Sequence, residues 1–186
     1  MQHPRRPRWA STLIASAAAL AGLALSPLTS SVLHASVAVA EPVAAVEVAA
    51  PLDASTAELA LLDLTNRDRL QNGLAPLSLD PSTLSIARDR AATQLGLPSL
   101  SHYDSAGQLA FVNLLDQSGV DYSLAGENLA RSSDVDSGVT ERVEDALMRS
   151  PTHRKNILEQ TFTRVSIGAA TDEQGRISFA EIFRAE

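Results

Sequence analysis

Apolar residues recur at helical spacing in four stretches of the chain, which predicts four amphipathic helices. The first begins at Ser55, which forms a capping-box pattern with Glu58, and it ends before Asn72-Gly73. The second begins at Asp80-Pro81 and ends at Leu95 before Gly96. The others run from about Ala106 to Ser118 and from about Gly138 to Arg149, and one short helical turn is expected from His153 to Leu158.

The C-terminal part changes to strand periodicity. Apolar residues alternate from Val165 to Ala169 and, less regularly, from Ile177 to Phe183, with a turn at residues 172–175 between them. Residues 123–131 are expected to form a short strand or an extended segment. Helices followed by a hairpin predict an α+β fold in which helices pack on a small antiparallel sheet.

The first forty residues do not fit this domain and are typical of an export signal. Arg5, Arg6 and Arg8 precede an apolar run from Ala10 to Leu25, which is shorter than the roughly 20 residues of a membrane-spanning helix. The small residues of the Ala38-x-Ala40 pattern place cleavage after Ala40, although earlier cleavage or a retained anchor are alternatives. We therefore expect a signal peptide at 1–40, an Ala-, Val- and Pro-rich linker at 41–54, a domain at 55–186, and an extracellular or cell-envelope location.

Charge and cysteine content narrow the class of protein. The leader holds three of the fifteen basic residues and none of the twenty-two acidic ones. The rest of the chain therefore has twelve basic and twenty-two acidic residues, which gives a net charge of −10. Such a chain repels phosphate backbones, which disfavours nucleic-acid binding. The chain has no cysteine, so no disulfide stabilises the domain and its core must do so. We expect a monomer.

Two histidines, His102 and His153, remain once the leader is removed. If the fold brings them together with a carboxylate such as Glu127, they would suit zinc or another divalent metal, or proton exchange near neutral pH. The alternative is that both histidines make ordinary contacts at helix ends and that Glu127 only holds backbone amides. Neither HExxH nor GxSxG occurs, and no cysteine nucleophile is available.

Several ordered segments resemble the CAP superfamily, named after cysteine-rich secretory proteins, antigen 5 and pathogenesis-related proteins, and in particular its cysteine-free bacterial branch. The matching pieces cover residues 56–184 and are Asn66-x-x-Arg69, Gly-Leu-x-Pro-Leu at 73–77, His102, Gly126-Glu127-Asn128, Ser150-Pro151-x-His153-Arg154-x-Asn156-Ile157-Leu158, Ile167-Gly168 and Phe183. The resemblance implies an α-β-α sandwich with a small antiparallel sheet between helical layers.

The resemblance also implies a cleft with two histidines and two acidic residues, which binds zinc or another divalent ion in some members. His102, Glu127 and His153 match three of these places, and Ser150 stands at the fourth. Glu144 or Asp145 are the acidic residues that could substitute. Three further residues, Asn66, Arg69 and Asn156, are expected to hold loops and helix ends through side-chain hydrogen bonds.

Three functions follow as hypotheses. The first is an exported binding module whose cleft, formed by His102, Glu127, His153 and Ser150, holds a metal, lipid or small molecule. The alternative is a metal-assisted hydrolase, acting on peptide or cell-wall material, with Glu127 as base and the two histidines as metal ligands. The third is a secreted structural domain without an active site. Family fold alone does not choose among them.

Overall fold

The computed structural model of the chain describes residues 15–19, 53–134 and 136–186. Its helices are α1 (Ala54–Gln71), α2 (Leu84–Leu95), α3 (Ala110–Gln117), α4 (Val139–Arg149) and α5 (Pro151–Ile157), and a 3₁₀ helix, η1 (Pro81–Thr83), precedes α2. Its strands are β1 (Ala15–Ala19), β2 (Ser78–Leu79), β3 (Leu124–Ser132), β4 (Arg164–Thr171) and β5 (Ile177–Ala185).

The strands form one sheet in the order β1-β3-β5-β4-β2. The central strand β5 pairs antiparallel with both β3 and β4, while β1 and β2 add in parallel at the two edges. Every residue of β5 is buried, because helices cover both faces of the sheet. This explains why apolar residues alternate less regularly in β5 than in β4.

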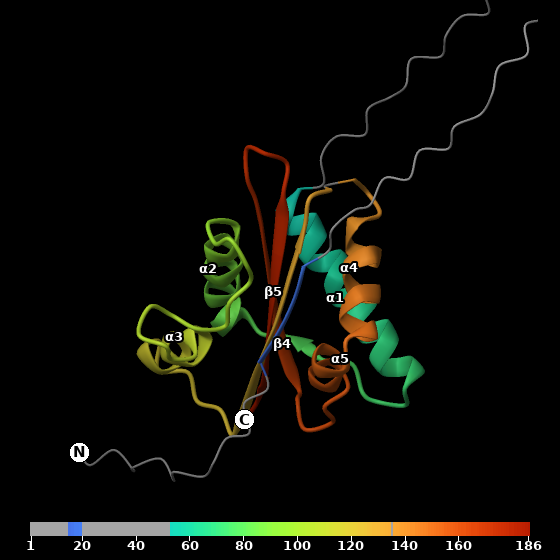
Figure 1. Ribbon diagram of the computed structural model, residues 1–186. Coiled ribbons are helices and arrows are strands. Elements are labelled where there is room, and N and C mark those ends of the chain that lie inside the picture. The colour runs from blue at the N-terminus through green and yellow to red at the C-terminus, as the bar shows by residue number, and fades with distance from the viewer. Residues whose placement is uncertain (1–14, 20–52, 135) are drawn as a thin grey trace, which may run out of the picture.

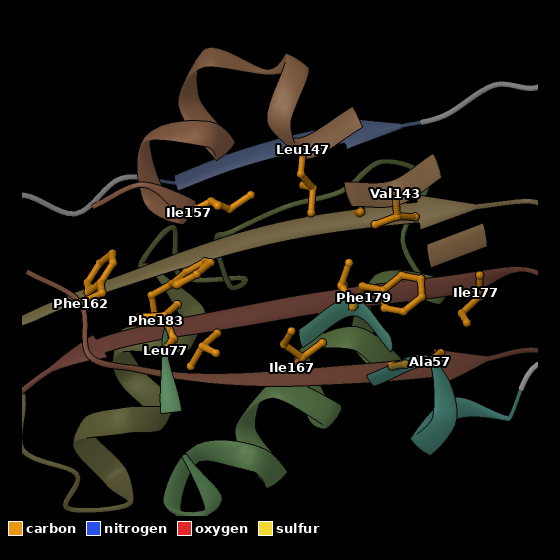
Figure 2. Packing of buried hydrophobic residues seen from close by; sticks show 14 of the residues in the cluster. Ala57, Leu77, Val143, Leu147, Ile157, Phe162, Ile167, Ile177, Phe179 and Phe183 are labelled. Atoms are coloured by element: carbon orange, nitrogen blue, oxygen red, sulfur yellow. The ribbon is translucent and has the colours of Figure 1, made fainter. Parts of the chain in front are cut away.

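Two helical layers enclose the sheet, with α2 and α3 on one face and α1, α4 and α5 on the other (Figure 1). The predicted α-β-α sandwich is confirmed. The larger core lies under α1, α4 and α5, where Leu147 and Ile157 point toward Phe179 and Phe183 (Figure 2). A smaller core lies on the opposite face of the sheet. There Phe111 and other apolar residues of α2 and α3 pack against β3 and β5.

Two predicted helix starts are wrong. Asp53, rather than Ser55, caps α1, since its carboxylate accepts a hydrogen bond from the Thr56 amide at 3.1 Å. Glu58 is unavailable for a capping box because it binds Arg88 and the Ala169 amide. The third helix begins at Ala110 instead of about 106, since Asp104 folds the preceding residues into a turn by accepting two backbone hydrogen bonds.

The predicted structural roles of Asn66, Arg69 and Asn156 are confirmed by their hydrogen bonds. Asn66 exchanges two hydrogen bonds with the Leu77 backbone, at 3.0 and 2.7 Å. The buried Arg69 donates to four backbone carbonyls, those of Ala75, Ile157, Glu159 and Phe162. Asn156 donates to the Glu127 carbonyl at 3.2 Å, which joins α5 to β3.

The N-terminal predictions are only partly within the described residues. Strand β1 lies inside the expected signal peptide and pairs with β3 from Glu127 to Arg131. The remaining leader and nearly all of the expected linker lie outside the described residues, so the cleavage site stays a prediction. Helix α1 begins at Ala54, the last residue assigned to the linker. Of the helices described, none is both long and apolar enough to cross a membrane.

Candidate functional site

Three side chains meet on the α2–α3 face of the sheet. The Glu127 carboxylate accepts two hydrogen bonds from the Arg90 guanidinium, at 2.7 and 3.1 Å. The same carboxylate lies 2.6 Å from Nδ1 of His102. All three residues are buried. The structure therefore brings His102 and Glu127 together as predicted and adds Arg90, a fixed cation that balances the buried carboxylate.

Strand and helix periodicity position this triad. Successive residues of β3 point to opposite faces, so Ala125, Glu127 and Leu129 share the face that packs against α2 and α3. Arg90 lies on the buried side of α2, one residue before Ala91. His102 follows a loop that Gln94 holds by exchanging two hydrogen bonds with the Ser101 backbone.

The hydrogen bond to Glu127 defines the chemistry of His102. A carboxylate at Nδ1 favours a proton on that nitrogen, which leaves a lone pair on Nε2 of the neutral ring. Nε2 is buried and has no hydrogen-bond partner within the described residues. Glu127 itself is fully engaged, since both of its oxygens already accept hydrogen bonds.

A pocket of about 390 Å³ adjoins the triad between α2 and α3. Arg90 lines it from the triad side, and Tyr103, the residue after His102, lines it with a ring that is 57% exposed. Apolar side chains are contributed by Leu97 and Leu114. The pocket therefore combines an aromatic face and apolar side chains with polar side chains, the groups that a small-molecule site uses to bind and orient its ligand.

His153 and Ser150 lie on the other face of the sheet. His153 is buried in α5, and its carbonyl accepts a hydrogen bond from Asn128, whose side chain points away from that of Glu127. Ser150 ends α4 and precedes α5, with its hydroxyl 3.1 Å from that of Thr152. The predicted four-residue cleft is thus not assembled in this structure, because β3 separates its two halves.

Across residues 15–19, 53–134 and 136–186, no group of three or more His, Asp or Glu side chains is arranged to hold a metal ion. His102 and His153, on opposite faces of β3, do not form a joint zinc site here. Metal binding through both histidines stays a prediction.

Asp145 and Glu144, the two acidic residues that could take the fourth place of the predicted cleft, differ in burial. Asp145 is exposed on α4 and lies 3.9 Å from Arg149. Glu144 is fully buried, and its carboxylate lies beside that of Glu181 on β5, with the Thr65 hydroxyl between them. Glu144 is therefore not part of the His102 site, from which the sheet separates it.

Sequence reasoning missed Arg90, Tyr103 and Glu181. Arg90 could have been found, since it stands at the helical spacing of the buried residues Ala87 and Ala91. An arginine on the apolar face of a helix needs a buried anion. Tyr103 and Glu181 carried no such signal, because only the fold shows what lies beside them.

Comparison with known proteins is consistent with this fold. The CAP family model, the cysteine-rich secretory protein family, matches residues 62–183. YkwD of Bacillus subtilis (strain 168) is 32% identical over 119 residues, which cover 64% of this chain and 44% of YkwD. The chain thus spans less than half of that relative.

Two solved structures share the fold. An extracellular protein containing a SCP domain from Bacillus anthracis superposes with a TM-score of 0.60 and 25% identity, over 74% of this chain and 45% of that protein. An outer surface protein from Borrelia burgdorferi gives a TM-score of 0.61 at 17% identity, over 74% and 98% of the two chains. The second likeness concerns the fold alone.

Proposed function

The chain belongs to the CAP family of cysteine-rich secretory proteins, and from that premise we propose that it is an exported module that binds a small molecule between α2 and α3. The observation that carries the proposal is the pocket of about 390 Å³ beside the Arg90–Glu127–His102 triad. Its volume is in the range of small-ligand sites. The relative from Bacillus anthracis, an extracellular protein at 25% identity, supports an exported location.

The charges around the pocket favour an uncharged ligand. Arg90 is neutralised by Glu127 at 2.7 Å. Asp104 already accepts hydrogen bonds from the Ala106 and Gln108 amides and from the Asn113 side chain. A neutral molecule with a flat face against Tyr103 would suit these groups. The mixture of polar and apolar groups favours such a molecule over a long lipid chain.

The hydrolase alternative has no comparable support. It requires Glu127 as a base, but Arg90 and His102 occupy both carboxylate oxygens. It also requires the two histidines in one site, and β3 lies between them. Turnover of a peptide and a muropeptide, compared between the wild type and Glu127→Ala, would revive this alternative if only the wild type were active.

Fragment binding tests the proposed site. A set of neutral aromatic fragments is added to the ¹⁵N-labelled full chain, and the amide shifts of Tyr103, Asp104, Asn113 and Leu114 are followed. Leu114→Trp should fill the pocket and abolish these shifts. Leu59→Trp is the control, since Leu59 is 59% exposed on α1, in the opposite layer. Shifts that lie elsewhere, or that survive Leu114→Trp, would show that the pocket is not the site.

Tyr103→Ala tests the role of the aromatic face of the pocket. Loss of stacking against the ring costs about 0.5 to 1.5 kcal/mol, so we expect a weaker dissociation constant, by up to about tenfold, for the best fragment. Affinity is measured by the same titration. An unchanged dissociation constant would mean that the ligand does not contact the Tyr103 ring.

A further inference from the structure

Two buried carboxyl groups meet on the face of the sheet opposite His102. Glu144 comes from α4 and Glu181 from β5, and both are inaccessible to solvent or nearly so. The hydroxyl oxygen of Thr65 on α1 lies 3.2 Å from Oε2 of Glu144 and 3.0 Å from Oε1 of Glu181. One hydroxyl thus stands between two acids in the interior.

Hydrogen-bond counting indicates a proton on this pair. A threonine hydroxyl carries one proton, so it can donate fully to one carboxylate at a time. The second contact becomes a full hydrogen bond only if the other carboxyl group is protonated and donates to Oγ1 of Thr65. In addition, Oε1 of Glu144 is buried and receives no hydrogen bond from a donor among the described residues, while the neighbouring acid Asp68 lies close to this carboxyl group. A buried, unsatisfied oxygen costs less on a neutral carboxylic acid than on a carboxylate.

The side chains whose contacts with the pair are described are acidic or neutral. From α1, Asp68 adds a third acid, which pairs with Arg67 at 3.0 Å. From β3, the neutral Asn128 donates to Oε2 of Glu181 at 2.9 Å and to the His153 carbonyl of α5. Within the part of the chain described, no lysine or arginine forms an ion pair with Glu144 or Glu181.

Burial and mutual repulsion act in the same direction on Glu144. Burial, followed by the charges of Glu181 and Asp68, raises the pKa of Glu144 to about 9. Burial also raises the pKa of Glu181 to about 7, against the hydrogen bonds from Asn128 and Thr65. Both values agree with the proton that the geometry requires.

We propose that Glu144 and Glu181 form a buried proton-binding site that joins α4 to the central strand and makes the domain sensitive to external pH. With the proton bound, Thr65 bridges the two acids and α1, α4 and β5 are held together. When the proton leaves, two negative charges face each other in the interior, and α4 is pushed from the sheet. This site is separate from the proposed ligand pocket and does not depend on it.

The direction of the pH effect follows from the raised affinity for protons. Between the ordinary pKa of an unfolded glutamate, about 4.3, and the higher values in the folded chain, the native state binds more protons than the unfolded state. Stability from this pair is therefore complete below about pH 4.5 and is lost as the pH rises toward 9.

Direct titration of the full chain tests for the bound proton. With ¹³C-labelled glutamate carboxyl groups, NMR should show one carboxyl signal whose midpoint lies well above those of the exposed glutamates. Glu144→Gln should remove that signal. If all glutamate carboxyl signals titrate within one pH unit of their ordinary values, the proposal is wrong.

Unfolding by urea tests the consequence for stability. The wild-type midpoint concentration should fall between pH 5 and pH 9, and the fall should be less than half as large in Glu144→Gln or Glu181→Gln. Asp145→Asn on the exposed side of α4 is the matched control and should keep the full fall. An equal fall in the wild type and both glutamine variants would contradict the proposal. If neither glutamine variant folds, the wild-type carboxyl titration alone decides.

Discussion

Arg90 of α2 and Glu127 of β3 meet between the helix and the sheet, and the two hydrogen bonds between them fix the carboxylate that contacts His102. An ion pair of this kind repays the cost of removing two charges from water only while both partners are present. Glu127 is completely buried, so it cannot recover water if Arg90 is removed. At the residue scale, this pair is therefore the most sensitive part of the candidate site.

Arg90→Met should lower the free energy of unfolding by about 3 to 5 kcal/mol, because it leaves an unpaired carboxylate in the interior. The double variant with Glu127→Leu should recover much of that loss, since no charge then remains buried. Arg149→Met is the control: its contact with Asp145 is exposed, and its cost should be below about 0.5 kcal/mol. Urea denaturation measures all three, and equal stability of Arg90→Met and the wild type would refute the assigned role.

At the scale of elements, the approach of α2 to β4 sets the position of the triad. Gly168 of β4 lies directly under α2, and a Cβ added there would come within 2.2 Å of the Ala87 carbonyl carbon. Only glycine allows the helix and strand backbones to come this close. The glycine of the Ile167-Gly168 motif therefore has a physical reason. It lets α2 approach β4 closely, and this approach sets the distance of Arg90 from the sheet.

Gly168→Ala should lower the free energy of unfolding by about 3 kcal/mol, since the clash is with backbone that cannot move locally. Gly96→Ala at the end of α2 is the control. A Cβ there would have only an ordinary contact of 3.7 Å with Thr93, so stability should change by less than about 0.5 kcal/mol. Thermal or urea unfolding of both variants gives the comparison. Similar stability of the two would mean that α2 does not press on β4 as described.

At the scale of the whole molecule, two sites with buried acidic residues contribute to stability with opposite dependence on pH. Burial acts to raise the pKa of Asp80, but hydrogen bonds from Arg184 and Ser82 outweigh it and hold the pKa below its usual value. Stability from the Asp80–Arg184 pair, at 2.7 Å, is present above the unfolded pKa and is lost as the pH falls through the folded one. The Glu144–Glu181 pair has the opposite dependence.

The free energy of unfolding should therefore pass through a maximum near pH 5 and decline on both sides. Asp80→Asn should flatten the acid side while leaving the decline toward pH 9 in place. Urea midpoints measured from pH 3 to pH 9 check both limbs. A profile that rises steadily through neutral pH would contradict the role given to the Glu144–Glu181 pair, and an acid side that Asp80→Asn leaves unchanged would contradict the role given to Asp80.

Much of this architecture could be predicted from the sequence because it depends on local periodicity. The spacing of apolar residues located the helices and the C-terminal hairpin, and Asp80-Pro81 marked the start of η1. The predicted cap at Ser55 was wrong because Asp53, just outside the apolar pattern, was the better placed acceptor. The two-residue strand β2 was too short to leave any pattern.

Local patterns and ordered motifs were enough to identify the CAP family, the α-β-α order of elements, and His102 and Glu127 as candidate site residues. Which candidates meet depended on the fold. Consecutive residues of a strand face opposite layers, so Glu127 joined Arg90 and His102 while Asn128 turned toward His153 and Glu181. The same alternation placed Glu144 against Glu181, a contact between distant segments that no local pattern could have predicted.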